Sequence, residues 1–311
     1  MSYKVFVDGA EGTTGLKIHE RLAVHGSVQA LMIEAALRKD PEARRKLMLE
    51  ADVVFLCLPD AAAKEAVKLS SGSNAIIIDA STAHRTADEW AYGFPELSSA
   101  HRQAIASAKR IAVPGCHATG MIAAVYPLVC EGIIKNDYPV SVHSITGYSG
   151  GGKKMIAEYE SNDRDSALSS PRQYGLSLTH KHLPEMRHVT GLARPPIFNP
   201  IVCDYYAGMA VSVPLNTECM QKKVTVNEVY DFYKGFYNGQ GMISVAMQPE
   251  SGFIPANAKC GHNDLTLYVC GNDDMMTIVN VFDNLGKGAS GAAVQCMNIA
   301  LGLPEEIGLK N

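Results

Sequence analysis

The chain has 311 residues, which is enough for two packed cores, because single cores rarely grow beyond about 250–300 residues. Hydrophobic residues make up 47% and charged residues 19%, which is typical of a globular protein. The net charge of -4 argues against nucleic-acid binding, which normally requires a basic face. We find no apolar span of about 18 residues and no signal-peptide pattern, so we expect no membrane association.

The cysteines are scattered along the chain and form no C-x-x-C pair. A chain of this length does not need disulfide bonds for stability, and scattered thiols are typical of a reducing compartment. We therefore expect free cysteines and a cytoplasmic protein.

The first third of the chain alternates strand and helix signals. Strand-like runs occur at 3–7, 28–33, 53–58 and 75–78, and the last two are continuously apolar. Such runs are typical of parallel strands buried on both faces. Asp40-Pro41 predicts a helix start, and Arg44-Arg45-Lys46 is expected on a solvated helix. The alternation predicts an α/β fold with a Rossmann-like, doubly wound parallel sheet.

After residue 117 the pattern changes to longer, partly alternating strands. These are expected at 138–146, 209–215, 242–247, 265–270 and 276–282. They predict a second α+β domain with a mixed or antiparallel sheet. The proline-rich stretch 191–200 is interpreted as a surface loop, and a helical pattern begins at Gly288.

A glycine loop separates the first predicted strand from the first predicted helix. Gly9, Gly12 and Gly15 have the spacing G-x-x-G-x-x-G, and Thr13 and Thr14 stand between the last two. Glycine lets the backbone approach a pyrophosphate, and the helix N-terminus supplies amide donors. The loop therefore predicts dinucleotide binding; the alternative is a tight turn without a ligand.

The preference between NAD and NADP stays open from the residues alone. Glu34 lies near the position where an acid binds the ribose 2′-hydroxyl of NAD. Arg38 and Lys39 follow closely and are able to pair with the 2′-phosphate of NADP.

Cys116 is the candidate nucleophile. It lies where the strand-like run 111–113 passes through Pro114-Gly115 into an apolar helix. A helix N-terminus stabilises a thiolate, and its amides can donate to an oxyanion. The alternative, a small buried thiol, is assumed for the other seven cysteines.

A nucleophile needs a base, and the best candidates are His180 and His182, with Glu185 to orient one of them. Alternate residues of an extended segment face one way, and a histidine pKa near neutrality suits proton transfer. An exposed polar loop or a metal site are the alternatives. No further ligands with metal-site spacing follow, so no metal is predicted.

Two further segments carry anion-binding chemistry. Gly147–Lys154 resembles a P-loop but lacks its final hydroxyl, which argues against a nucleoside triphosphatase. Glycine-rich amides around Gly151, together with Lys153, still predict a phosphate or other anion site. Arg85 follows a buried strand, at the edge where ligands collect, and its guanidinium is able to hold a phosphate.

Taken together, these motifs resemble the N-acetyl-gamma-glutamyl-phosphate reductases, in particular their short (type 2) form, within the semialdehyde dehydrogenase superfamily. The resemblance spans nearly the whole chain. The segments that carry it are 9–15, 56–60, 79–85, 92–96, 114–116, 147–153, 180–185 and 283–291.

The resemblance implies NADPH-dependent reduction of an acyl phosphate to a semialdehyde through a cysteine thioester, in arginine biosynthesis. It implies that Cys116 is the nucleophile, that His182 or His180 with Glu185 moves the proton, and that Arg85 lies near the substrate phosphate. It also marks Arg38, Ser81 and Asn284 as cofactor-binding residues. We favour His182 slightly, because Glu185 can orient it.

The resemblance further implies discontinuous domains. We expect residues 1–116 with 287–311 to bind NADP, and residues 117–286 to carry catalysis and self-association into a dimer or tetramer. Two alternatives remain: the same chemistry on another small acyl phosphate, such as aspartyl phosphate, and a non-catalytic dinucleotide-binding regulatory protein.

Overall fold

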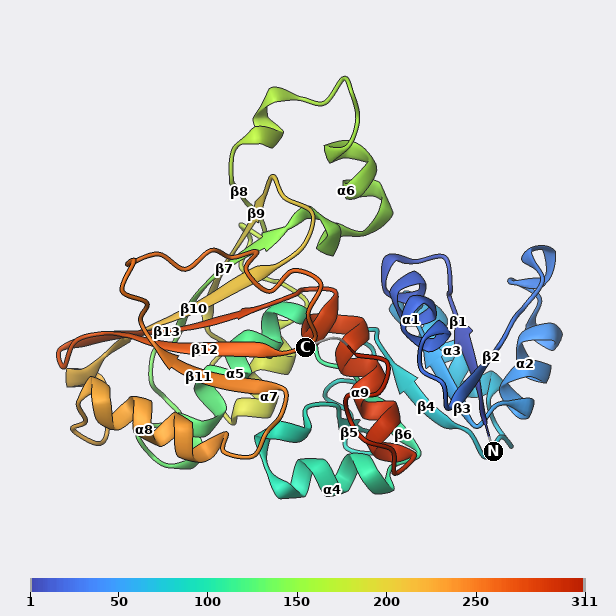
Figure 1. The fold of residues 1–311 in the computed structure, drawn as a ribbon, viewed down its shortest axis with the longest axis horizontal. Helices are drawn as coiled ribbons and strands as arrows, with labels where there is room; N and C mark the ends of the chain where they lie inside the picture. The colour runs from blue at the N-terminus through green and yellow to red at the C-terminus, as the bar shows by residue number, and fades with distance from the viewer. Residues whose placement is uncertain (1, 310–311) are drawn as a thin grey trace. The chain divides into compact units, whose positions relative to one another are not determined.

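The computed structural model describes residues 2–309, which divide into two compact units. Of the described residues, the first unit contains 2–115 and 289–309, and the second unit contains Cys116–Gly288. In Figure 1 the first unit runs from blue to cyan and returns in red, while the second unit runs from green to orange-red.

The first unit is built on a parallel sheet. Its strands within residues 2–309 are β1 (Tyr3–Asp8), β2 (Val28–Leu31), β3 (Val53–Leu56), β4 (Ile76–Asp79), β5 (Ala91–Tyr92) and β6 (Arg110–Ala112). Their order is β2-β1-β3-β4-β6-β5, and each neighbouring pair is parallel. The order reverses at β1, which creates a ligand-binding edge where β1 and β3 end. The predicted doubly wound sheet is confirmed.

Helices cover both faces of this sheet. They are α1 (Thr13–Ala23), α2 (Pro41–Glu50), α3 (Asp60–Leu69), α4 (Ser99–Ser107) and α9 (Gly291–Ala300), with short 3-10 turns η1 (Ala35–Leu37) and η2 (Pro95–Leu97). Helices α1, α4 and α9 pack on the face that carries Val5 and Phe55. Helices α2 and α3 pack on the opposite face, which carries Phe6 and Val54. Burial on both faces explains why these strands are continuously apolar.

Helix α2 begins as predicted, but its basic run is not solvated. The Asp40 side chain caps the helix by accepting from the Ala43 amide at 2.8 Å, and Pro41 follows. Arg44 is buried and donates to both carboxylate oxygens of Asp8 at the end of β1, with the closest contact at 2.8 Å. The expectation of a solvated Arg44 is therefore wrong, because Asp8 offers it a buried charge partner.

The second unit contains a mixed sheet. Its strands are β7 (Ser141–Gly147), β8 (Arg172–Gln173), β9 (Ile197–Cys203), β10 (Met209–Asn216), β11 (Ile243–Met247), β12 (Leu265–Gly271) and β13 (Met275–Phe282). Their order is β11-β12-β13-β10-β7-β9-β8. The β11–β12 and β7–β9 pairs are parallel and the other pairs are antiparallel, so the predicted mixed sheet is confirmed.

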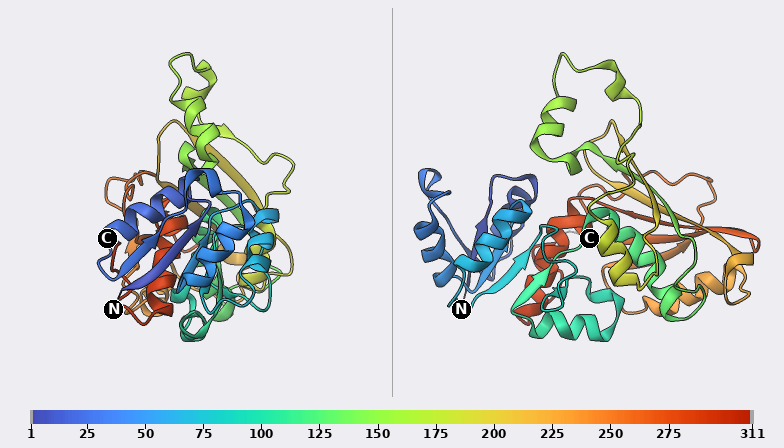
Figure 2. Two further views of the ribbon diagram at one scale, coloured as in Figure 1. Left: turned by 90° about the vertical axis from the view of Figure 1, so that its right-hand side faces the viewer. Right: turned by 180° about the vertical axis from the view of Figure 1, so that it is seen from behind.

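The helices of the second unit place the candidate nucleophile. They are α5 (Cys116–Cys130), α6 (Gly152–Tyr159), α7 (Leu183–Thr190) and α8 (Val226–Phe236), with short turns η3 (Tyr148–Gly151), η4 (Ser166–Ser169), η5 (Thr217–Cys219) and η6 (Gly286–Ser290). Helix α5 packs on β10 and β13 beside α7, and α8 packs on β11 and β12. The segment from η3 to β8 projects beyond the sheet of this unit (Figure 2).

Strand β9 occupies part of the stretch expected to be a loop. The expectation for 191–200 is wrong from Ile197 onward, where β9 pairs with β7 in parallel. Pro200 lies in the middle of this strand and argues against a strand in the sequence, because proline has no amide hydrogen to donate to a neighbouring strand. It is tolerated here because β9 lies near the sheet edge, with only the two-residue β8 beyond it.

Two tyrosines of the α8 region hold α5 at its internal proline. Pro127 has no amide hydrogen, so the Ala123 carbonyl loses its usual helical donor. The Tyr237 hydroxyl donates to that carbonyl at 2.7 Å, and the Tyr233 hydroxyl donates to the Ala124 carbonyl at 2.5 Å. These bonds fix the helix that begins with Cys116.

Candidate functional site

The glycine loop of the first unit lies at the carboxyl end of β1. Gly9 has φ +88°, and a β-carbon there would collide with the carbonyl oxygen of Cys57, just after β3. A β-carbon at Gly15 would stand 2.6 Å from the carbonyl oxygen of Gly9, whereas one at Gly12 would meet nothing closer than 3.6 Å. Gly9 and Gly15 are therefore required for the turn itself, and Gly12 leaves space above it.

The start of α1 fits an anionic ligand. Thr13 and Thr14 form its first turn, which contains no acidic residue, and Gly12 offers no side-chain cap. The Thr13 hydroxyl oxygen is buried and has no hydrogen-bond partner within residues 2–309. Unpaired helix amides beside an unpaired buried hydroxyl are what the phosphate of a dinucleotide would satisfy.

Arg38 and Glu34 flank the short turn η1. Arg38 forms an ion pair with Glu11 of the glycine loop, so its guanidinium faces this loop. Glu34 is exposed. The structure thus brings Arg38, and with it a positive charge, to the proposed dinucleotide loop.

The segment after β4 forms a buried polar cluster. Asp79 accepts from the Ser81 hydroxyl at 2.7 Å and lies 2.6 Å from His84 Nδ1. His84 stacks on Trp90 with ring centroids 4.1 Å apart. Arg85 is buried, and it donates through Nε to the Val113 carbonyl at 2.9 Å and through Nη2 to the Ala80 carbonyl at 3.1 Å. Both Ser81 and Arg85 are thus held in place by backbone or carboxylate partners.

In the second unit, Cys116 is the first residue of the 15-residue helix α5 and is half-buried. Its side chain is thereby next to the positive end of the helix dipole and to the first amides of the helix. This is the environment in which a cysteine reacts as a thiolate. Within residues 2–309, none of the cysteines forms a disulfide bond.

A cluster of aromatic rings surrounds the residue after the nucleophile. His117 Nδ1 lies 2.7 Å from the Ser144 hydroxyl and Nε2 lies 2.7 Å from the Tyr174 hydroxyl. The rings of His180 and His182 each lie 5.6 Å from that of His117. Burial, with smaller contributions from His180 and Lys181, lowers the pKa of His117 to about 3, so this ring is neutral.

The structure brings His180 and His182 together, with ring centroids 4.7 Å apart. His180 Nδ1 accepts from the His182 amide at 3.2 Å, and burial lowers the pKa of His180 to about 4. The expected pKa near neutrality is therefore wrong for His180, because burial disfavours its cation. His182 precedes α7, whose first turn carries the buried Glu185.

The second glycine-rich segment follows β7. Gly151 and Lys153 are exposed at the junction of η3 and α6. Asn284 is buried, where it donates to the Ser149 hydroxyl at 3.0 Å and accepts from the Gly208 amide at 2.8 Å. Asn284 therefore ties the start of this segment to the chain before β10.

Sequence reasoning missed Gly288, which lies against Cys116, and the two partners of His117, Ser144 and Tyr174. Ser144 lies on the buried face of β7, a position that period-2 alternation identifies without revealing its partner. Tyr174 follows the two-residue strand β8, which has no sequence signal. Gly288 lies in segment 283–291 and begins a predicted helix, but neither feature reveals its contact with Cys116.

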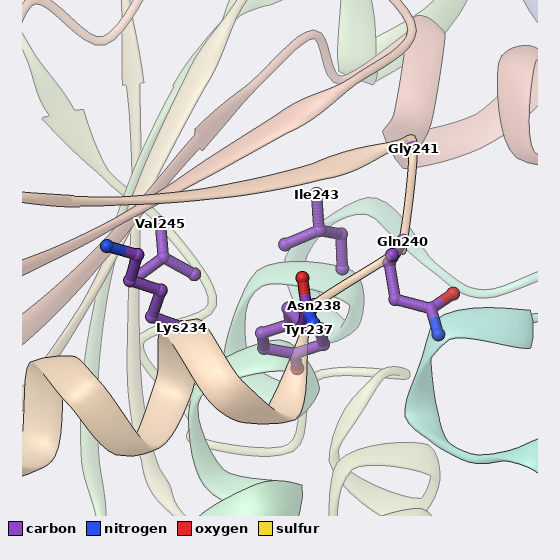
Figure 3. Close-up of a pocket in the computed structure, with 8 residues that line it drawn as sticks. Lys234, Tyr237, Asn238, Gln240, Gly241, Ile243 and Val245 are labelled. Carbon is purple, nitrogen blue, oxygen red and sulfur yellow. The ribbon is translucent and has the colours of Figure 1, made fainter.

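A shallow hollow of 390 Å³ lies elsewhere in the second unit, where the end of α8 faces β11 (Figure 3). None of the predicted site residues lines it. Within residues 2–309, no group of three or more histidine, cysteine, aspartate or glutamate side chains is arranged to hold a metal ion. No helix of this range combines the length and apolar character needed to cross a bilayer.

Comparison with known families gives two adjacent matches. The model described as "Semialdehyde dehydrogenase, NAD binding domain" matches residues 30–107, and "Semialdehyde dehydrogenase, dimerisation domain" matches residues 116–284. A protein of Nostoc sp. named N-acetyl-gamma-glutamyl-phosphate reductase 2 is 43% identical, over 98% of this chain and 99% of its own. The N-acetyl-gamma-glutamyl-phosphate reductase of Brucella ovis is 43% identical, over 97% of this chain and 100% of its own.

Solved structures are similar in fold. Aspartate semialdehyde dehydrogenase II from Vibrio cholerae superposes with a TM-score of 0.73 at 14% identity, covering 97% of this chain and 99% of its own. The aspartate semialdehyde dehydrogenase from Francisella tularensis gives 0.72 at 15% identity, covering 96% and 99%.

Proposed function

This chain belongs to the N-acetyl-gamma-glutamyl-phosphate reductase family, and from that premise we propose the reaction it catalyses and the residues responsible. It is an oxidoreductase that uses a nicotinamide dinucleotide. Its reaction is the reduction of N-acetyl-L-glutamyl 5-phosphate to N-acetyl-L-glutamate 5-semialdehyde, a step of arginine biosynthesis. The observation that carries the chemistry is Cys116 at the start of α5, followed by the histidine cluster.

The first step is acyl transfer to Cys116. The thiolate forms a bond to the acyl carbon, the carbon–oxygen bond to phosphate breaks, and phosphate leaves with the electron pair and one proton. The first amides of α5 stabilise the oxyanion at the attacked carbon. The bound dinucleotide supplies a hydride for reduction of the thioester. The carbon–sulfur bond then breaks, which releases the aldehyde and restores the Cys116 thiolate.

We assign the proton shuttle at the substrate oxygen to His182. His180 Nδ1 is engaged by a backbone amide, so neutral His180 carries its hydrogen on Nε2 and acts as a donor. Its pKa of about 4 means that it does not hold a second proton near neutral pH. His182 donates to the oxygen during reduction and takes the proton back as the aldehyde forms, with the buried Glu185 as its orienting partner.

The proposed cofactor is NADP. The glycine loop, the Thr13 hydroxyl and the first amides of α1 suit the pyrophosphate, together with Thr14. Arg38 supports the preference for NADP, because it is the cation already drawn to this loop through Glu11. We include Ser81 and Asn284 as cofactor-binding residues on the strength of the family resemblance alone.

For the substrate, we propose that Arg85 lies near the phosphate and that Gly151 and Lys153 form a further anion-binding segment. The anchoring of Arg85 by two backbone carbonyls supports a fixed guanidinium, which suits recognition of a rigid phosphate group. Aspartyl phosphate is the alternative substrate, but the aspartate enzymes match at 14–15% identity, which bears on the fold alone.

We also propose that the protein is a cytoplasmic homo-oligomer, a dimer or tetramer. Cysteines that form no disulfide bond within the described part of the chain support a reducing compartment. The matched family domain is described as a dimerisation domain. On the sheet face turned away from α5, Ile145 and Ile197 are 36% and 56% exposed, and contact between two such faces would bury them.

The reverse reaction tests the proposal. Purified protein is given N-acetylglutamate semialdehyde, phosphate and NADP⁺, and NADPH formation is followed by absorbance. We expect phosphate-dependent turnover that is lost in Cys116→Ala and kept in Cys219→Ala, whose thiol is exposed. Turnover with aspartate semialdehyde but not with N-acetylglutamate semialdehyde would show that aspartyl phosphate is the substrate instead. Tight NADPH binding without turnover on either aldehyde would support a regulatory binding protein instead.

A further inference from the structure

The glycine loop proposed to receive the pyrophosphate carries acidic side chains and no basic side chain of its own. Asp8 directly precedes Gly9, Glu11 lies inside the loop, and residues 8–15 contain no lysine or arginine. A pyrophosphate is itself negatively charged, so each carboxylate disfavours its binding unless a cation compensates the charge. The compensating cations come from another part of the first unit.

Arg44 is the cation that faces Asp8. Its Nη2 donates to Asp8 Oδ2 at 2.8 Å, and its Nε lies 3.2 and 3.3 Å from the two carboxylate oxygens. The two side chains are only 9% and 5% exposed. Arg44 and Met48 are the buried residues of α2, on the side where an apolar residue would ordinarily pack. A buried charge carries a desolvation cost there, so packing alone does not explain the arginine.

The other ionisable neighbours of this pair do not compensate Asp8. Glu65 of α3 lies 3.7 Å from Arg44 Nη1, but it is itself an acid, and its side chain is 59% exposed and screened by water. Cys57 follows β3, and burial raises the pKa of its thiol, so it is uncharged. Burial also raises the pKa of Asp8, and Arg44 opposes that effect. Arg44 therefore keeps a carboxylate that is buried beside the loop both ionised and neutralised.

We propose that the Asp8–Arg44 pair sets the charge beside the glycine loop, with Arg44 neutralising the Asp8 carboxylate so that the pyrophosphate of a dinucleotide binds there. The inference rests on the proposed dinucleotide binding at this loop. Arg44 is a positioning residue that acts through Asp8 rather than by touching the cofactor. Its effect is the same for NADPH and NADH, because both carry the pyrophosphate, whereas Arg38 is proposed to distinguish them.

Equilibrium binding of NADPH and NADH, followed by their fluorescence, tests the proposal through opposite effects of two variants. Asp8→Asn removes the carboxylate and leaves the Arg44 cation, so both dinucleotides should bind about three- to ten-fold more tightly. Arg44→Met leaves the buried carboxylate without its cation, so both should bind about ten-fold or more weakly. The double variant removes both charges and should bind them about as tightly as the unchanged protein does.

A ligand without a pyrophosphate separates this charge effect from a structural effect. Adenosine 2′-monophosphate carries the adenosine half of NADP alone, and its Kd should change by less than about two-fold in each variant. Lys46→Met removes an exposed cation from the same helix and should leave every Kd unchanged. Circular dichroism reports whether each variant is folded. If Arg44→Met does not fold, the tighter binding expected for Asp8→Asn tests the proposal alone.

The pH dependence of binding supplies a second readout. In Arg44→Met, protonation of Asp8 removes the repelling charge, so the affinity for NADPH should recover as pH falls from about 8 to about 6. The double variant has no carboxylate at position 8 and should not show this recovery. A structural defect in Arg44→Met would not depend on the residue at position 8.

The outcomes distinguish the inference from the proposed function. NADPH binding that is unchanged or weaker in folded Asp8→Asn overturns the inference and leaves the proposed cofactor intact. Equal weakening of NADPH and adenosine 2′-monophosphate in Arg44→Met also overturns it, because the pair would then be structural. No binding of NADPH or NADH by the unchanged protein contradicts the proposed function and the inference with it. Tighter binding in Asp8→Asn that the double variant reverses supports both.

Discussion

Gly288 lies against Cys116 so closely that a β-carbon at position 288 would stand 2.9 Å from the Cβ of Cys116. Asp283 holds this glycine in place. Its carbonyl accepts from the Gly288 amide at 3.0 Å, and its buried carboxylate accepts from the amides of Leu285 and Gly261 at 2.7 and 2.6 Å. The backbone of η6 around Gly288 therefore forms a fixed wall beside the candidate nucleophile.

Gly288→Ala is expected to displace the Cys116 side chain, because its new methyl group meets Cβ rather than a flexible chain end. A shift of this size should lower kcat by about ten- to a hundred-fold with little change in KM. Steady-state kinetics checks the prediction. Gly241→Ala is the matched control, since a β-carbon there meets no atom within 4 Å. Equal kcat values for the two variants would show that Gly288 does not determine the position of the Cys116 side chain.

Arg38 should control the preference for NADPH over NADH. Arg38→Ala removes the cation proposed to meet the 2′-phosphate, so KM for NADPH should rise by about ten-fold or more while KM for NADH stays the same. Glu11→Gln releases Arg38 from its ion pair and should lower KM for NADPH by about two- to five-fold. An equal rise in KM for NADPH and for NADH in Arg38→Ala would instead indicate that Arg38 stabilises the glycine loop.

The sequence predicts the parts of this fold that depend on local patterns. Apolar strands, the capped start of α2 and the glycine loop after β1 are each encoded in a few neighbouring residues. The family resemblance inferred from the motifs is confirmed by relatives at 43% identity. The assignment of individual site residues stays a prediction.

The features that the sequence does not predict depend on contacts between distant residues. Arg44 is buried because Asp8, 36 positions away, offers it a charge partner. His117 owes its neutral state to burial near residues more than 50 positions away, such as Tyr174. Hydrophobic periodicity carries no information about such pairs, and Pro200 even argues against the strand that contains it.

The buried Arg44–Asp8 pair makes a specific stability prediction. Arg44→Met leaves the Asp8 carboxylate buried without its partner, so the free energy of unfolding should fall by about 3–5 kcal/mol. The double variant Asp8→Asn with Arg44→Met removes both charges and should recover most of this loss. Urea unfolding checks both variants, with Lys46→Met, an exposed position on the same helix, as control. A loss no larger than that of Lys46→Met would contradict a buried pair.

The neutral state of His117 predicts acid sensitivity. Burial lowers its pKa from 6.5 to about 3 in the folded protein, so between these values the unfolded chain binds more protons than the folded chain. Stability therefore rises with pH through this window and is lost as pH falls below about 6.5, by up to about 1.4 kcal/mol per pH unit from this residue. The free energy of unfolding in urea at pH 7, 6 and 5, at constant ionic strength, gives the slope.

His117→Gln removes the titrating group and should flatten that slope, even if it lowers stability at neutral pH by disturbing the bonds to Ser144 and Tyr174. His188→Gln, at an exposed position of α7, should leave the slope unchanged. An identical slope in the unchanged protein and in His117→Gln would mean that the ring titrates alike in both states.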